Sequence, residues 1–262
     1  MTGNAWAVIT GASSGIGKAL ALEFAARGYH VFLTGRNESA LRTVAAECER
    51  QSKVQTRVHV ADLANGMQAD SLVAALAAEP LEFEILVNNA GFGINGDFVD
   101  TDLAAELDMV QVQILSMLKL TKALLPGMLS RRSGRILNVA SVYSFAASPH
   151  QAVYGACKNF LLSFSTALAE ETRGTGVTVT TLCPGVTQTD FRARAGIADH
   201  NKAAGISATA VARLAVIDTL RGDTVVIPRF INKLFVFGVR HLPIRVVARV
   251  VKFINRQRGV NE

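Results

Sequence analysis

The sequence predicts one doubly wound α/β domain, in which helices cover both faces of a seven-stranded, mostly parallel sheet. Two observations favour this fold. Short apolar runs rich in β-branched residues alternate with longer segments of helical period, which is typical of βαβ units. The 262-residue chain is also 50% hydrophobic and 18% charged, so it can bury one large core. We assign residues 1–228 to this domain, since no repeat or linker interrupts them, and 229–262 to a C-terminal extension.

The expected strands are separated by segments of helical period. The first strand, 5–10 (AWAVIT), leads into a glycine-rich turn, and the second, 30–34 (HVFLT), ends at a polar loop. Further strands are expected at 54–60, 83–89, 134–141, 177–183 and 224–228. Helices are expected near 15–28, 38–52, 66–79, 101–130, 152–173 and 207–221, several of them ended by Gly or bounded by Pro.

The cysteines and the start of the chain indicate a cellular compartment. Cys48, Cys157 and Cys183 show no metal-ligand spacing such as CxxC, so no metal site is expected, and this sparse, odd set favours a reducing environment. The sequence begins without the pattern of a signal peptide, and no stretch reaches about 18 uncharged apolar residues. We therefore expect a cytoplasmic protein without a membrane-spanning helix.

The basic residues gather in the extension. Eight Lys or Arg residues and one acidic residue lie between Arg229 and Glu262, so the extension accounts for the net charge of +6. Nucleic-acid-binding proteins usually carry a basic face across the fold, with aromatic platforms or a reading helix, and residues 1–228 show neither. Nucleic acid is therefore not an expected partner.

The extension also has an amphipathic pattern. Pro243 separates two helical pieces, and most of the basic residues lie off a stripe of apolar residues at three- and four-residue spacing. The stripe consists of Phe230, Leu234, Phe237, Ile244, Val247, Val251 and Ile254. Such an element can pack on its own domain, contact a second subunit, or rest peripherally on an anionic membrane. We favour packing or a subunit contact, and the membrane alternative stays open.

A glycine-rich turn connects the first strand to the first helix. Its sequence is TGASSGIG (10–17), and a helical pattern rich in Ala and Leu follows. Glycines let the backbone approach a pyrophosphate, and the free N–H groups at a helix N-terminus stabilise its charge. The turn therefore predicts a nucleotide-binding site, although a turn that merely needs glycine is the simpler alternative.

Five motifs together resemble the short-chain dehydrogenase/reductase family, classical type, over nearly all of residues 4–228. They are the TGxxxGxG turn at 10–17, NNAG at 88–91, Ser141 thirteen residues before a tyrosine, YxxxK at 154–158, and Pro184-Gly185. The resemblance implies a Rossmann-type fold and an oxidoreductase that uses a nicotinamide cofactor. It also implies a homo-oligomer built from the two long helices, near 101–130 and 151–173.

Tyr154 and Lys158 are the expected catalytic pair. They lie one turn apart on one helix face, where we expect the Lys158 cation to lower the pKa of the Tyr154 phenol. Tyr154 can then exchange a proton with a substrate alcohol or carbonyl while hydride moves to or from nicotinamide. The resemblance implies that Ser141 holds the substrate oxygen and that Lys158 also contacts the nicotinamide ribose.

Gln113 departs from the family pattern. Family members carry an Asn at this position, thirteen residues before a Leu-Pro pair, as part of a catalytic tetrad that anchors a water for proton relay. Gln keeps the amide but is one methylene longer, and a displacement of about 1 Å can cost roughly a hundredfold in rate. We expect Gln113 to support a working but slower relay.

Arg36, at the end of the second strand, indicates the cofactor. An acidic residue there would favour NAD(H), whereas an arginine accommodates a 2′-phosphate, so we expect NADP(H), with NAD(H) possible. By resemblance, Asp62-Leu63, Asn89, Ala90, Val186 and Thr189 match cofactor-lining positions. The expected cofactor contacts are Gly11, Ser13, Ser14, Gly15, Ile16, Gly17, Arg36, Asp62, Leu63, Asn89, Ala90, Gly91, Tyr154, Lys158, Val186 and Thr189.

The substrate region is expected to be apolar. The resemblance places it at 142–150, at 92–94 and under a lid at about 187–206, with Tyr143, Phe145, Phe92, Ile94 and Phe191 as bulky members. The sequence thus predicts an NADP(H)-dependent oxidoreductase that interconverts a carbonyl and a secondary alcohol on a small-molecule substrate. A cofactor-binding regulator or scaffold is the first alternative, left open by Gln113, and a methyltransferase, disfavoured by Arg36, is the second.

Overall fold

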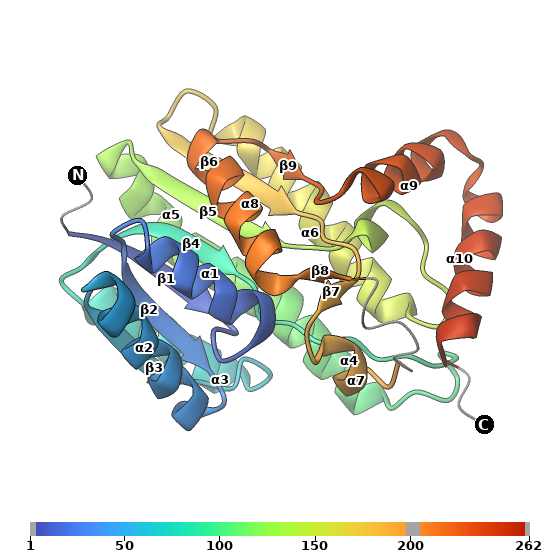
Figure 1. The fold of residues 1–262 in the computed structure, drawn as a ribbon, viewed down its shortest axis with the longest axis horizontal. Coiled ribbons are helices and arrows are strands. Elements are labelled where there is room, and N and C mark those ends of the chain that lie inside the picture. The colour runs from blue at the N-terminus through green and yellow to red at the C-terminus, as the bar shows by residue number, and fades with distance from the viewer. Residues whose placement is uncertain (1–3, 198–204, 260–262) are drawn as a thin grey trace.

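The computed structural model describes residues 4–197 and 205–259, and a seven-stranded parallel sheet lies at its centre (Figure 1). The strand order is β3-β2-β1-β4-β5-β6-β9. The strands are β1 (Ala5–Thr10), β2 (His30–Gly35), β3 (Thr56–Val60), β4 (Glu82–Asn88), β5 (Gly134–Val139), β6 (Val177–Leu182) and β9 (Val225–Val226). The predicted fold class is confirmed. The chain changes direction across the sheet between β1 and β4, which is where parallel α/β sheets bind ligands.

Alternating side chains on β1 show how the sheet builds two core layers. Ala7 and Ile9 pack into one hydrophobic cluster, and Trp6 and Val8 pack into the other. Helices α1 (Gly15–Ala25), α2 (Glu38–Ser52) and α8 (Ala208–Arg221) supply the first cluster. Helices α3 (Gly66–Ala78), α5 (Ser116–Arg131) and α6 (Ala152–Glu171) supply the second. Because both faces are covered, all six residues of β1 are buried.

The helix expected near 101–130 contains an irregular segment. It begins as α4 (Leu103–Val110), passes through a π-helical segment at Gln111–Leu115 and continues as α5. The whole run, Leu103–Arg131, is long and apolar enough to cross a membrane by length and composition alone. However, Met109, Met117, Leu120 and Met128 on it are buried against the rest of the protein, as in the core helix of a globular domain.

Three short elements escaped the sequence prediction. A two-stranded sheet joins β7 (Thr187–Gln188) to β8 (Ile206–Ser207), and the short helix α7 (Phe191–Arg194) lies between them in the chain. A 3-10 turn spans Val142–Phe145. The strands β7 and β8 are too short to show alternation, and no apolar run surrounds them as one surrounds β9. Residues 198–204 of the expected lid lie outside the described residues.

The extension forms two helices, α9 (Phe230–His241) and α10 (Ile244–Gly259), at one end of the molecule beyond the sheet (Figure 1). The break falls next to Pro243, as predicted. Val247 and Val251 on α10 are buried with Ala146. The extension therefore packs on its own domain on one side. The predicted stripe is only partly buried, since Phe230, Leu234 and Phe237 of α9 are exposed.

Candidate active site

A cavity of about 870 Å³ runs along the carboxyl ends of the strands. All the residues expected to bind the cofactor line it, together with Ser141. Gln113 does not line it. The glycine-rich turn thus shares one continuous space with Arg36 and Asp62 and with Ser141, Tyr154 and Lys158, although these residues come from widely separated parts of the sequence.

The glycine turn forms a cradle that side chains would fill. Gly11 and Gly15 have positive φ angles of 64° and 57°, and a Cβ on Gly17 would lie 2.2 Å from the Gly11 carbonyl oxygen. Within the described residues, Ser14 at the α1 N-cap makes no side-chain bond to the first turn. The N–H groups there remain available to an anion, so the turn fits a pyrophosphate.

Thr10 ties the NNAG segment to this turn. Its hydroxyl accepts hydrogen bonds from the backbone N–H groups of Asn89 and Ala90, both at 2.9 Å, and donates to the Val87 carbonyl at 3.2 Å. The Asn89 side chain donates to the Thr10 carbonyl at 2.9 Å. Thr10 therefore braces the two cofactor loops against each other.

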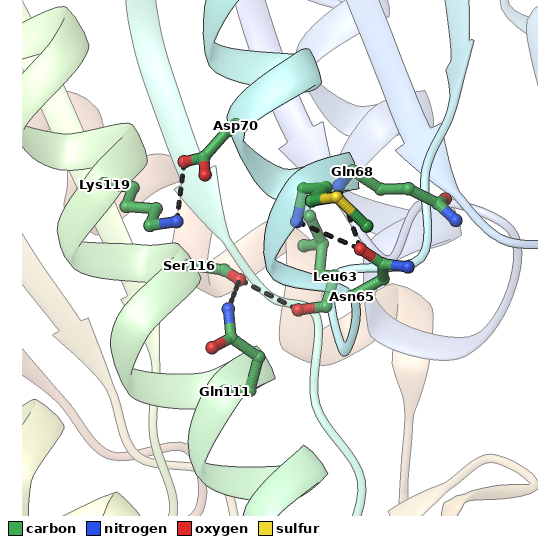
Figure 2. Close-up of polar contacts among 8 residues, drawn as sticks. Leu63, Asn65, Gln68, Asp70, Gln111, Ser116 and Lys119 are labelled. Atoms are coloured by element: carbon green, nitrogen blue, oxygen red, sulfur yellow. Dashed lines mark hydrogen bonds and ion pairs between the residues drawn. The ribbon is translucent and has the colours of Figure 1, made fainter.

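Helix α5 holds the Asp62-Leu63 segment in place. The Ser116 hydroxyl donates to the Leu63 carbonyl at 3.0 Å and accepts from the Gln111 side chain at 3.4 Å (Figure 2). In the same view, Lys119 on α5 pairs with Asp70 on α3 at 2.6 Å. These contacts fix the loop at the adenine end of the cavity.

Arg36 lies across this end of the cavity from Asp62. The two charged groups approach to 4.0 Å, and the Arg36 side chain is 69% exposed. At that distance in water the attraction is weak, so the guanidinium can turn to another anion at little cost.

Ser141, Tyr154 and Lys158 come together as buried side chains at the end of β5 and on α6. The Lys158 Nζ donates to the Val139 carbonyl at 2.9 Å and lies 5.6 Å from the Tyr154 ring centroid. The Ser141 Oγ accepts from the Tyr143 N–H at 3.2 Å. The Tyr154 ring also contacts Phe191, with centroids 5.7 Å apart.

The pKa values of this group correct one expectation. Burial raises the pKa of Tyr154, and the hydrogen bond with Ser141 opposes this only in part. Lys158 was expected to lower the Tyr154 pKa, but burial outweighs any such effect and lowers the pKa of Lys158 itself to about 8. Tyr154 is therefore a neutral phenol near pH 7, able to donate a proton.

Gln113 lies beneath the NNAG segment, within the π-helical segment. Its Nε2 donates to the Phe92 carbonyl at 3.0 Å, while its Oε1 is buried without a hydrogen-bond partner among the described residues. A small cavity of about 10 Å³ adjoins Gln113, Asn88 and Thr10. That volume is about the least that holds one water. The role of Gln113 in a proton relay stays a prediction.

Apolar side chains line much of the rest of the cavity. Phe92, Tyr143 and Phe191 line it as expected, whereas Ile94 and Phe145 do not. The sequence prediction missed the wall supplied by the extension, which consists of Ile231, Asn232, Phe235, Ile254 and Asn255. The sequence prediction also missed Arg192 and Arg194 of α7, which line the cavity. For the wall supplied by the extension, the amphipathic pattern of residues 244–254 was the one available signal.

Asn255 fastens α10 to the catalytic loop. Its side chain is 3% exposed; the Oδ1 accepts from the Tyr143 hydroxyl at 2.6 Å, and the Nδ2 donates to the Pro149 carbonyl at 2.8 Å. Tyr143 follows Ser141 closely in the chain. The extension is therefore joined to the segment that carries Ser141.

The family model described as short chain dehydrogenase matches residues 5–200. The chain belongs to the short-chain dehydrogenase/reductase family. This membership confirms the predicted family. It also excludes the methyltransferase alternative.

Similar proteins extend this result. The very-long-chain 3-oxoacyl-CoA reductase of Laccaria bicolor is 40% identical over 179 residues, which are 67% of this chain and 52% of that protein. The Homo sapiens enzyme of the same name is 38% identical over 184 residues, 68% of this chain and 58% of that protein. This short-chain dehydrogenase/reductase thus spans about half the length of the curated relatives it matches.

Two solved structures have the same fold over nearly the whole chain. A short-chain dehydrogenase from Sphingobium yanoikuyae in complex with NADPH has a TM-score of 0.82 and 29% identity, covering 90% of this chain and 93% of that one. A 7beta-hydroxysteroid dehydrogenase has a TM-score of 0.85 and 27% identity, covering 94% and 96%. The NADPH in the first structure agrees with the cofactor expected from Arg36.

We predict that replacing Arg36 of this short-chain dehydrogenase/reductase with Leu weakens NADPH binding by about ten- to a hundredfold and leaves NADH binding unchanged. The variant loses a charge-assisted hydrogen bond that only the 2′-phosphate can accept. Dissociation constants from fluorescence titration check this. Arg42→Leu is the matched control, because Arg42 is equally exposed at 69% and does not line the cavity. An equal loss for both cofactors would contradict the role of Arg36.

Lys158 should make stability depend on pH. Its folded-state pKa of about 8 lies below the ordinary value of 10.5, so the charged form is penalised in the fold below pH 8. The contribution of Lys158 to the free energy of unfolding should therefore rise by about 3 kcal/mol from pH 8 to pH 10.5, and the comparison with a variant that lacks this amine isolates it from other titrating groups. We expect Lys158→Met to be more stable than wild type in urea at pH 7.5, and the difference to shrink at pH 9.5. A variant less stable at both pH values would contradict this.

Replacing Gln113 with Asn tests the relay. If the extra methylene displaces a relay water, the Asn variant should turn over faster, by up to about a hundredfold in kcat. Loss of the Phe92 contact alone would raise KM and leave kcat as it was. Steady-state kinetics separate the two, and Gln111→Asn in the same π-helical segment is the control. Unchanged turnover would mean that the extra methylene has no importance.

Proposed function

We propose that this enzyme uses NADPH to reduce a ketone to a secondary alcohol on a bulky, apolar substrate, with a long-chain 3-oxoacyl thioester as the first candidate. The observation that carries the proposal is the apolar wall beside the catalytic group. Phe92, Phe191, Ile231, Phe235 and Ile254 line the same cavity as Ser141 and Tyr154. A hydrocarbon chain gains free energy when such a wall removes it from water.

The chain's own residues can perform the proton chemistry. NADPH, when bound, supplies the hydride to the carbonyl carbon. The Ser141 hydroxyl would hold the substrate oxygen by a hydrogen bond. Tyr154, neutral because of its burial, donates its proton as negative charge develops on that oxygen. Lys158 would contact the ribose.

The names of the relatives favour the thioester. Two enzymes at 40% and 38% identity are named as reductases of very-long-chain 3-oxoacyl-CoA, and their matched segments cover most of this chain. The 7beta-hydroxysteroid dehydrogenase favours a second candidate class, a fused-ring ketone, because it covers 94% of this chain. Both classes are large and apolar.

A substrate series tests the proposal. NADPH oxidation is followed at 340 nm with 3-oxoacyl thioesters of increasing chain length and with steroid ketones, using Tyr154→Phe as the blank. We expect kcat/KM to rise with chain length. If only the steroids react, the second class is correct. If NADPH binds but no ketone is turned over, the protein is a cofactor-binding regulator or scaffold.

We also propose a cytoplasmic homo-oligomer. Exposed apolar side chains on the two long helices support a subunit contact, namely Leu103, Leu107, Leu115 and Leu129 on the run from α4 to α5 and Phe160 on α6. Light scattering coupled to gel filtration tests it. A monomeric mass would contradict the contact.

A further inference from the structure

Helix α9 has an apolar side that nothing in the described fold covers. Phe230, Leu234 and Phe237 recur at three- and four-residue spacing, so they share one side of the helix, and they are 80%, 53% and 61% exposed. Val236 on another side is buried. The helix is therefore held to the domain by one side and presents the other to its surroundings.

Helix α10 carries three separate stripes. Val247 and Val251 form the buried one, which continues to Asn255. The exposed apolar stripe consists of Val246, Val250 and Phe253. The exposed basic stripe consists of Arg245, Arg249, Lys252 and Arg256. At 100° per residue, the basic stripe is centred roughly 100° from the exposed apolar stripe and roughly 130° from the buried one, so apolar and basic side chains adjoin on the exposed part of the helix. This is the arrangement of a helix that lies in a membrane interface.

The charge of residues 229–256 indicates what covers the exposed apolar side chains of α9 and α10. Residues 229–256 contain no Asp or Glu, and Lys233 and Arg240 add exposed cations on α9. A symmetric contact with a second copy would bring these like charges together, which costs free energy. An anionic surface with an apolar interior satisfies both the cations and the exposed hydrocarbon.

We propose that α9 and α10 dock on an anionic phospholipid membrane. The docking face comprises Phe230, Ile231, Leu234, Phe237, Leu242, Ile244, Val246, Val250 and Phe253, with the basic residues at the headgroups. Ile231 is 56% exposed and also lines the cavity, so the face continues into its apolar end. Resting on the proposed function, this continuity lets a lipid substrate enter from the bilayer without crossing water.

Vesicle flotation with the full chain tests the docking. Vesicles of phosphatidylcholine with phosphatidylglycerol should carry the protein, and pure phosphatidylcholine should carry far less. The double variants Phe237→Ser/Phe253→Ser and Arg249→Glu/Lys252→Glu should each lower binding by about tenfold or more. Met67→Ser on α3 is the control, because Met67 is 79% exposed and α3 lies apart from α9 and α10 (Figure 1).

The outcomes distinguish docking from the proposed function. Phe237 and Phe253 do not line the cavity, so their variant should turn over a short, water-soluble 3-oxoacyl thioester as wild type does. Binding to vesicles without any ketone turnover would refute the function and leave the docking intact. Failure of wild type to float with anionic vesicles overturns the docking. So does a change of oligomeric mass in the Phe variant without a change in flotation, which would assign the face to a second copy.

Discussion

Replacing Tyr154 with Phe is expected to lower the turnover number by about a hundred- to ten-thousandfold, the range supplied by a positioned general acid. The substitution removes only the hydroxyl. The ring that remains can keep its contact with Phe191, so the cavity wall stays in place. NADPH should therefore bind within about twofold of wild type, because binding does not need the proton that Tyr154 donates. Single-turnover NADPH oxidation and a fluorescence titration measure the two quantities.

Tyr143→Phe is the matched control for this experiment. Tyr143 also lines the cavity, but its hydroxyl is engaged with Asn255 at 2.6 Å. Its removal should change kcat by less than tenfold and act mainly on KM through the position of α10. If Tyr143→Phe abolished turnover and Tyr154→Phe did not, the general acid would be Tyr143.

Replacing Gly17 with Ala is expected to weaken NADPH binding at least about a hundredfold and to lower the free energy of unfolding by about 1–3 kcal/mol. The new Cβ would lie 2.2 Å from the Gly11 carbonyl oxygen, a backbone atom that can move only with the whole turn. Such a shift misaligns the N–H groups that would hold the pyrophosphate. Calorimetric titration with NADPH and urea unfolding measure both effects.

Gly238→Ala provides the control for the glycine change. Gly238 lies within α9, and a Cβ there meets nothing within 4 Å. Alanine should stabilise the helix by about 0.5–1 kcal/mol and leave NADPH binding unchanged. A Gly17→Ala variant that binds NADPH as tightly as wild type would show that the turn does not cradle the cofactor.

The fold and the cofactor end of the site were predictable because their signals are local. The run AWAVIT is apolar at its first five positions and buried at all six, as expected of a central parallel strand, and the glycines that follow allow close backbone approach. Arg36, Asp62 and Asn89 lie within two residues of the ends of β2, β3 and β4, and the carboxyl ends of parallel strands meet at one edge. Their assembly therefore follows from the strand order alone.

The substrate end was less predictable because it depends on contacts between distant residues. Nothing near Asn255 in the sequence indicates that its side chain bonds to Tyr143 and to the Pro149 carbonyl. The predicted direction of the Tyr154 pKa shift was wrong. Helical spacing shows the neighbouring Lys158, but it does not show that both groups are buried. The helical period of the sequence likewise gave no indication of the π-helical segment around Gln113.

The position of α9 and α10 in the chain has an evolutionary consequence. The residues proposed to bind the dinucleotide and transfer the proton end at Thr189, whereas residues 231–255 add a separate part of the cavity wall. Under the proposed function, exchange or drift of this late segment would change which substrate fits without disturbing hydride transfer. Descendants of one ancestral protein could thus diverge in substrate specificity while they keep the same cofactor-binding and proton-transfer residues.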